Sequence, residues 1–315
     1  MSSIANPALW TLFVTGVVGL LALDLFVFHR KPHAVRTREA LIWSTVWIAM
    51  ALLFNALVYF HFGAQRGLEF LTGYLIEKAL AIDNLFVFAV IFSYFKIQPA
   101  DQHRVLFWGV VGALVFRAVF IALGATLLTH LHWITYVFGA ALVVTGLKLL
   151  RREAPIRAEG NRLFHALRTL IPTSPVQSGQ FFIRDNSIVL ATPLFLALVL
   201  VEISDVVFAF DSIPAIFAVT SDTFIIFTSN VFAILGLRAM YSLLAQFLTR
   251  LKYLRFGLAL VLVFVGGKML FATMYKIPIE ISLAVVAALL LAAAIPSLLV
   301  SRDSHMSPSW EERRH

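Results

Sequence analysis

The chain contains no cysteine among its 315 residues, so disulfide bonds, thiolate metal sites and thiol redox chemistry within this chain are excluded. Charged residues are also scarce. They make up 13% of the sequence, and hydrophobic residues make up 60%, whereas soluble domains average about 25% and about 45–50%. The composition therefore indicates an integral membrane protein rather than one or two soluble domains of this total length.

Several functional signatures are missing as well. The net charge of +8 is not gathered with aromatic residues into a basic surface patch, so we expect no binding to nucleic acid. The N-terminus lacks a basic n-region and a small-residue cleavage site, which predicts that the first apolar run is retained as a span. The sequence has no HExxH, GxSG or Gly-x-Gly-Asp motif. We therefore expect that the protein is not an enzyme and needs no organic cofactor.

Nine apolar segments are each long enough to cross roughly 30 Å of hydrocarbon. They lie at about residues 8–28, 40–61, 69–95, 105–128, 132–150, 188–218, 223–247, 254–273 and 278–300. These segments predict an all-α polytopic membrane protein with a single transmembrane domain over residues 1–300, a basic loop at 151–187 and a tail at 301–315. Within the loop, NRLFHALRTL fits either a helix on the membrane surface or an ordinary linker helix.

The positions of Lys and Arg predict the orientation. Eighteen of the 25 basic residues fall in the loops and tail on one side of the nine spans, and only Arg66 and Lys276 fall on the other. The side that is rich in Lys and Arg is expected to be cytoplasmic. This places the N-terminus outside, and the loop and the C-terminus in the cytoplasm. The other five basic residues lie within spans: Lys78, Arg117, Lys148, Arg238 and Lys268.

Carboxylates occur where lipid-compatible side chains are expected. Five of the six membrane carboxylates lie on two spans, namely Glu77, Asp83, Glu202, Asp205 and Asp211. An acid at the centre of a membrane helix costs about 2.5–3.5 kcal/mol on insertion scales. Such residues mark a functional site by default, and their clustering predicts a cation site inside the helix bundle. The sixth acid, Asp24, lies near a membrane face and could serve either the site or the surface.

The neighbouring side chains offer further hard oxygen ligands. The Asn84 amide and the Ser204 and Ser212 hydroxyls lie close to the acids in the sequence. Carboxylate, carbonyl and water ligands suit Mg²⁺, Ca²⁺ and Mn²⁺, whereas zinc and copper favour imidazole or sulfur. Pro214 is expected to kink or open the helix beside Asp211, because it cannot donate to the carbonyl of residue 210. An opened turn would free backbone carbonyls as additional ligands.

The basic residues within the spans allow a different interpretation. Arg117 and Arg238 lie in mid-span and could neutralise the acids, so that the charges would only hold helices together. Lys78 could do the same. Lys148 and Lys268 lie near membrane faces, where their ammonium groups could extend to water. Simple neutralisation, however, does not require three acids within ten residues.

Spans three to five and spans six to eight share landmarks in the same order. Asp83-Asn84 corresponds to Asp211-Ser212, each preceded six residues earlier by another acid. GALVFRA corresponds to AILGLRA, and VVTGLKLL corresponds to VFVGGKML. Because each unit has three spans, the second copy would be inverted relative to the first. Inverted three-plus-three repeats are typical of secondary transporters, although chance similarity of short apolar strings is the alternative.

The expected chemistry couples the metal to protons. Burial in a low dielectric favours the neutral acid unless a cation offsets the cost of desolvation. Metal binding requires the ionised form, so metal ions and protons compete for the same oxygens. We therefore expect a cation/proton exchanger. Which acids bind metal and which carry protons stays open.

Six strings then carry a family resemblance: LDLFVFHRK, FLTGYLIEKALAIDNLFVF, QHRVLFWGVVGALVFRAVFI, VEISDVVFAFDSIPAIFAVTSD, SNVFAILGLRAMY and LVFVGGKML. On these strings the chain resembles the TerC/Alx family of bacterial integral membrane proteins, over nearly its whole length. The resemblance implies an inner-membrane protein that handles metal ions, with manganese export as its best supported role. It also implies that the six membrane acids lie on the ion path.

Two other classes of function compete with the transporter. A membrane-embedded aspartyl protease would use two of the aspartates. A non-transporting scaffold or metal sensor, including a role in tellurite resistance, would act through partner proteins and the loop at 151–187. The lipid bilayer, metal cations and protons are the expected partners, with a homo-oligomer or other membrane proteins as further ones.

Overall fold

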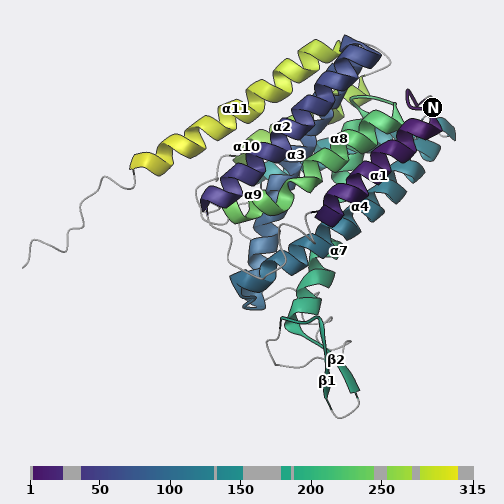
Figure 1. Ribbon diagram of the computed structural model, residues 1–315. Coiled ribbons are helices and arrows are strands. Elements are labelled where there is room, and N and C mark those ends of the chain that lie inside the picture. Colours follow the sequence, from purple (N-terminus) through teal and green to yellow (C-terminus); the bar gives the residue numbers. More distant parts are fainter. Residues whose placement is uncertain are drawn as a thin grey trace, which may run out of the picture.

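The computed structural model describes residues 3–23, 37–130, 133–151, 179–185, 188–244, 254–271 and 277–303. Helices make up nearly all of this part (Figure 1). Their bounds are α1 (Pro7–Leu23), α2 (Thr37–Phe62), α3 (Ala64–Tyr94), α4 (Pro99–His130), α5 (Ile134–Arg151), α7 (Pro193–Phe217), α8 (Thr223–Leu235), α9 (Leu237–Leu244), α10 (Leu254–Leu270) and α11 (Ile279–Asp303).

Helices overlap all nine predicted spans, and α8 and α9 together occupy the seventh. Four stretches of the described residues are long and apolar enough to cross a membrane: α2, residues 99–127 of α4, α7, and residues 223–243 of α8 and α9. Shorter apolar helices cover Pro7–Leu23, Phe256–Leu270 and Ile279–Ala294. Asp24 and the amphipathic stretch at 161–170 lie outside the described residues.

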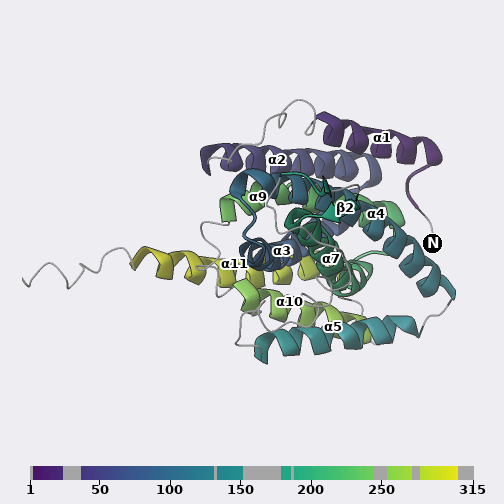
Figure 2. The same ribbon diagram turned by 90° about the horizontal axis from the view of Figure 1, so that it is seen from below.

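The two helices that carry most of the acids lie in the middle of the bundle. Seen from below in Figure 2, α3 and α7 are central, with α1 and α2 on one side and α5 and α10 on the other. Helix α3 packs against α2, α7, α8 and α11, and α7 packs against α3 and α4. The side chains on their inner faces are therefore shielded by protein and not by lipid.

The prediction for the start of the sixth span was wrong. Residues 188–191 form a strand and not a helix: β2 (Ile188–Ala191) pairs antiparallel with β1 (Phe182–Asp185). This hairpin, which the all-α prediction missed, projects beyond the helices in Figure 1. Helix α7 begins only at Pro193, because proline favours the first helical position. The Thr192 hydroxyl before it donates to the carbonyl of Gln180 at 2.7 Å.

The helix break lies elsewhere than expected. Helix α7 continues through Pro214 to Phe217, so the structure does not contain the predicted opened turn. The seventh span is interrupted instead, at Gly236 between α8 and α9. There the Lys78 ammonium of α3 donates to the carbonyl of Ala233 at 3.1 Å. The last turn of a helix leaves carbonyls without intrahelical donors, and Lys78 satisfies one of them.

Helices α5 and α10 approach each other through glycines. A Cβ atom added at Gly266 would lie 2.6 Å from the carbonyl oxygen of Gly139 and 2.9 Å from the Cβ atom of Leu142. A Cβ atom added at Gly146 would lie 2.7 Å from the carbonyl oxygen of Ala259. Small residues let membrane helices pack backbone to backbone. The contact between these two helices therefore depends on missing side chains.

This contact predicts opposite outcomes for two adjacent glycines. Gly266→Ala should lower the apparent melting temperature in detergent, because overpacking a close contact costs about 1–3 kcal/mol. Gly267 has no neighbouring atom within 4 Å of its added Cβ. Gly267→Ala should therefore be neutral or slightly stabilising, since alanine has the higher helix propensity. Equal melting temperatures for the two variants would contradict the close approach of α5 and α10.

Candidate cation site in the helix bundle

A single arginine joins the acidic residues of the two central helices. Arg117, on α4, is 1% exposed. Its Nη1 forms an ion pair and hydrogen bond with Oε2 of Glu77 on α3. Its Nη2 lies 3.5 Å from Oδ1 of Asp205 on α7. Three helices thus meet at one guanidinium, and residues 128 positions apart in sequence supply its two carboxylates.

The geometry of α3 explains which of its polar residues reach this point. Glu77 and Asn84 are seven residues apart, close to two turns of an α-helix, so they share a face. The Asn84 amide Nδ2 donates to Oδ1 of Asp205 at 3.3 Å. Asp205 therefore accepts from both α3 and α4. Asn84 and Glu77 are 1% and 0% exposed.

Several oxygens of this cluster, and of other polar residues on α7, remain without a hydrogen-bond donor. Among the described residues, these buried and unsatisfied atoms are Glu77 Oε1, Asn84 Oδ1, Glu202 Oε2, Asp205 Oδ2 and Ser212 Oγ. A buried acceptor without a partner costs about 1–3 kcal/mol, and more when it is charged. Such atoms require a cation, a proton or water as a partner. All of them are hard oxygens.

Glu202 lies one turn before Asp205 on α7 and is set apart from the arginine. Its carboxyl group lies against Gly112 of α4. In the described part of the chain it belongs to no ion pair, and Asp205 is the charged neighbour that acts on it. Among the described side chains, α3, α4 and α7 therefore contribute the Arg117 guanidinium and the carboxylates of Glu77, Asp205 and Glu202 to this region.

The described contacts include only some of the predicted ligands. Among the described side chains, no group of three or more Asp, Glu or His residues lies close enough together to hold a metal ion. The backbones of Asp83 and Asp211 belong to α3 and α7, but their side chains lie outside the described part, as does Asp24. The Ser204 hydroxyl donates to the carbonyl of Leu200 at 2.7 Å, which is a bond within its own helix.

The other four bases in the spans take no part in the described contact between Arg117 and its two acids. Lys78 donates to the end of α8, as described above, and no ion pair joins it to an acid whose side chain the structure describes. Lys268, on α10, donates to the Ser282 hydroxyl of α11 at 2.9 Å. Lys148 is exposed in the last turn of α5, and Arg238 is buried on α9. Of these five bases, Arg117 is the one that the described contacts place between acids.

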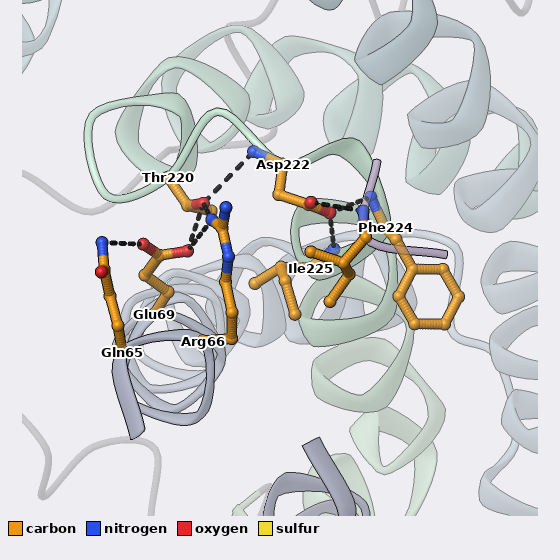
Figure 3. Close-up of polar contacts among 8 residues, drawn as sticks. Gln65, Arg66, Glu69, Thr220, Asp222, Phe224 and Ile225 are labelled. Carbon is orange, nitrogen blue, oxygen red and sulfur yellow. Dashed lines mark hydrogen bonds and ion pairs between the residues drawn. The ribbon is translucent and has the colours of Figure 1, made fainter. Parts of the chain in front are cut away.

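A second polar network was missed by the sequence reasoning (Figure 3). Glu69, near the start of α3, accepts from Arg66 Nη1 at 2.7 Å, Gln65 Nε2 at 3.1 Å and Thr220 Oγ1 at 2.6 Å. The Thr220 hydroxyl in turn accepts from the backbone amide of Asp222 at 3.2 Å. This network joins α3 to the segment between α7 and α8.

Asp222 extends the network to the N-terminal segment. Its Oδ1 accepts from the amides of Phe224 at 3.0 Å and Ile225 at 3.2 Å, and so caps α8. Its Oδ2 accepts from the amide of Ile4 at 2.7 Å. An aspartate directly before an apolar run is a helix-start signal, which could have identified this residue. The network is satisfied by hydrogen bonds, and we assign it a structural role.

Arg117 should be essential for stability, because its removal leaves two buried carboxylates uncompensated. Arg117→Gln is expected to cost about 3–5 kcal/mol, the usual effect of breaking a buried ion pair. Adding Glu77→Gln and Asp205→Asn removes all three charges with little change in volume and should recover most of the loss. Thermal melting in detergent measures both variants. A single variant as stable as the triple variant would contradict the shared ion pair.

Asp222 should hold both the start of α8 and the N-terminal segment. Asp222→Ala is expected to cost about 0.5–2 kcal/mol from the lost cap. It should also increase hydrogen exchange at the amides of Ile4, Phe224 and Ile225, which lose their acceptor. The exposed acid Glu280 on α11 provides the control, Glu280→Ala. Unchanged exchange at Ile4 would show that Asp222 does not bind that segment.

Comparison with known proteins places the chain in a family. Residues 62–305 match the model of the integral membrane protein TerC family. An uncharacterised membrane protein of Myxococcus xanthus is 52% identical over 307 residues, which cover 97% of this chain and 96% of that protein. The proposed membrane-bound redox modulator Alx of Escherichia coli K12 is 48% identical over 297 residues, covering 91% and 92%.

A membrane protein of Rickettsia bellii is 40% identical over 292 residues, covering 92% of this chain and 97% of that protein. No solved structure matches the chain. The family match covers more than half of the sequence, and the strings that carry the resemblance include Glu77, Arg117 and Asp205. The chain belongs to the TerC family of integral membrane proteins.

Proposed function

We propose that this protein exports a divalent metal cation, Mn²⁺ first, across the bacterial inner membrane in exchange for protons. The observation that carries the proposal is the excess of buried carboxylate over buried base at the junction of α3, α4 and α7. Acids in the interior of a membrane bundle are expensive and mark ion pathways. The preference for Mn²⁺ rests on the hard oxygen ligands and on the family resemblance.

The charge balance fits a divalent ion. When all are ionised, Glu77, Asp205, Glu202 and Arg117 together carry two negative charges. One divalent cation neutralises them, and so do two protons. An exchange of one metal ion for two protons therefore keeps the buried site neutral in both loaded states. Asp83 and Asp211, which follow on the same two helices, are the further acids proposed for the ion path, with Asp24 nearer a membrane face.

Arg117 would act as a built-in cation when the metal is absent. It uses Oε2 of Glu77 and Oδ1 of Asp205, and it leaves Oε1 and Oδ2 of the same carboxylates without donors. A metal ion could bind these remaining oxygens together with the Asn84 carbonyl. It would then weaken the hold of Arg117 on both acids. Ser212 is proposed as a supporting hydroxyl ligand.

The inverted repeat remains part of this proposal, and the helix contacts support it. In the proposed repeat, Gly146 corresponds to Gly266, and Gly139 corresponds to Ala259. Gly146 contacts Ala259, and the two counterparts, Gly266 and Gly139, also contact each other. Gly73 of α3 faces Ser229 of α8. The counterpart of Gly73 in the other half is Val201 of α7, which faces Gly109 of α4. Gly109 lies within one residue of the counterpart of Ser229. Inverted repeats of this kind allow alternating access around a central site.

The name of the Alx relatives suggests a second candidate, a role in redox balance. This chain has no cysteine, so such a role would not use thiol chemistry of its own. A non-transporting scaffold or sensor acting through partner proteins is the corresponding proposal. It predicts that function survives loss of the buried acids and depends on the loop at 151–187.

Metal flux in proteoliposomes separates these functions. We expect the wild-type protein to carry Mn²⁺ against an imposed proton gradient. Glu77→Gln, Asp205→Asn and Asp211→Asn should reduce the flux about tenfold or more, because a lost charged ligand removes about 1.5–3 kcal/mol. Glu280→Gln removes an exposed carboxylate from α11 and should leave the flux unchanged. Metal affinity should rise with pH, because protons compete for the ligands.

Three outcomes would change this proposal, and each would change a different part of it. Flux no higher than in empty liposomes, with folded and inserted protein, would favour the scaffold. Flux that persists in Glu77→Gln and Asp205→Asn would remove the acidic cluster from the ion path. Flux of Ca²⁺ or Mg²⁺ in place of Mn²⁺ would keep the site and change the transported ion.

A further inference from the structure

Three glycines of α4 face α7, and one of them meets a different kind of neighbour from the other two. A Cβ atom added at Gly109 would lie 3.0 Å from Cγ1 of Val201, and one added at Gly124 would lie 2.8 Å from Cε2 of Phe217. These two contacts are apolar. A Cβ atom added at Gly112 would instead overlap the whole carboxyl group of Glu202, meaning Cδ, Oε1 and Oε2.

The carboxylate of Glu202 is thus held in a position that only glycine leaves open. Its Oε2 is buried there without a hydrogen-bond donor among the described residues. A buried carboxylate without a partner is costly, so packing alone does not account for this arrangement. Glu202 as a whole is only half-buried. A side chain at position 112 would therefore turn the carboxylate away more readily than it would separate the helices.

We infer that Gly112 is a positioning residue of the cation site. Its missing side chain makes the space on α4 in which the Glu202 carboxylate lies one turn from Asp205. The inference rests on the proposed function, because it gives Gly112 a role through Glu202 in cation binding. Gly112 itself offers no ligand from a side chain. It determines where the carboxylate of Glu202 can lie.

The proposed repeat supplies a comparison within the same chain. In that alignment Glu202 and Gly112 correspond to Tyr74 of α3 and Ala233 of α8. Tyr74 and Ala233 belong to one buried apolar cluster. The half that has Tyr74 thus has alanine at position 233. The half that has Glu202 has glycine at the corresponding position 112. This difference agrees with a requirement for space beside Glu202 in particular.

The test compares Gly112→Ala with Gly109→Ala, which adds the same methyl group one turn earlier on α4 and against Val201. Equilibrium binding of Mn²⁺ to the purified full-length protein is measured together with thermal melting. Gly112→Ala should weaken Mn²⁺ binding about tenfold, close to the effect of Glu202→Gln, because one carboxylate ligand is displaced. Gly109→Ala should bind Mn²⁺ as the wild type does.

A shorter acid provides a rescue. Glu202→Asp withdraws the carboxylate from α4 by one methylene group, so Gly112→Ala should harm the Glu202→Asp protein much less than it harms the wild type. If Gly112→Ala prevents folding, adding Glu202→Ala should restore it, because the overlapping group is then gone. Failure of both rescues would overturn the inference.

The remaining outcomes separate this inference from the proposed function. If Glu202→Gln binds and transports Mn²⁺ normally, Glu202 has no part in the site, and the proposed role of Gly112 fails with it. If Glu202→Gln loses binding while Gly112→Ala binds as Gly109→Ala does, the transport proposal stands and the positioning role of Gly112 is wrong.

Discussion

The buried guanidinium of Arg117 is the constraint on which the rest of this structure depends. A charge in the interior of a membrane bundle must be paired and shielded from lipid. Glu77 and Asp205 pair with it from two different helices. This requirement brings α3, α4 and α7 together at one point and places α3 and α7 in the middle of the bundle. The surrounding helices then supply the apolar surface that faces lipid.

An ion pair with Arg117 and the binding of a transported ion would require different oxygens of these acids to be free. An ion pair that satisfied every oxygen would stabilise the fold but would leave no atom for a transported ion. In this structure each paired carboxylate uses one oxygen for Arg117 and leaves the other without a donor. Glu69 and Asp222 differ, because their oxygens accept from several donors. The contrast between the two networks separates a candidate site from a structural one.

The sequence was sufficient to predict the positions of the helices and the helices that carry the acids. Long apolar runs and a composition poor in charge determine where helices can span. The hairpin at 182–191 was not predictable in the same way, because a short apolar run such as Ile188–Ala191 fits a strand or a helix. The position of Pro193 was the available signal for the start of α7.

The details of the site were less predictable, since they depend on contacts between helices. Pro214 predicted a kink or an opened turn in α7, but the helix continues past it without an opened turn, and the interruption lies in the seventh span at Gly236. Lys78 and Glu77 are neighbours in sequence but point to different partners, α8 and α4. Asn84 was predicted as a further oxygen ligand near the acids, but the sequence did not show that its amide would donate to Asp205 on another helix. Spacing along one helix predicts a shared face, but not the residue opposite it.

Glycine has a different role in each of two helix contacts, and this difference connects packing with the proposed transport. Between α5 and α10, glycines let two backbones touch. Between α4 and α7, Gly112 makes room for a carboxylate and not for a backbone. A transporter that moves one half against the other needs interfaces that slide and a site that keeps its ligands in place. Close glycine contacts have few interlocking side chains and suit the first need. The space beside Glu202 serves the second, because it holds an acid within one turn of the arginine-bound pair.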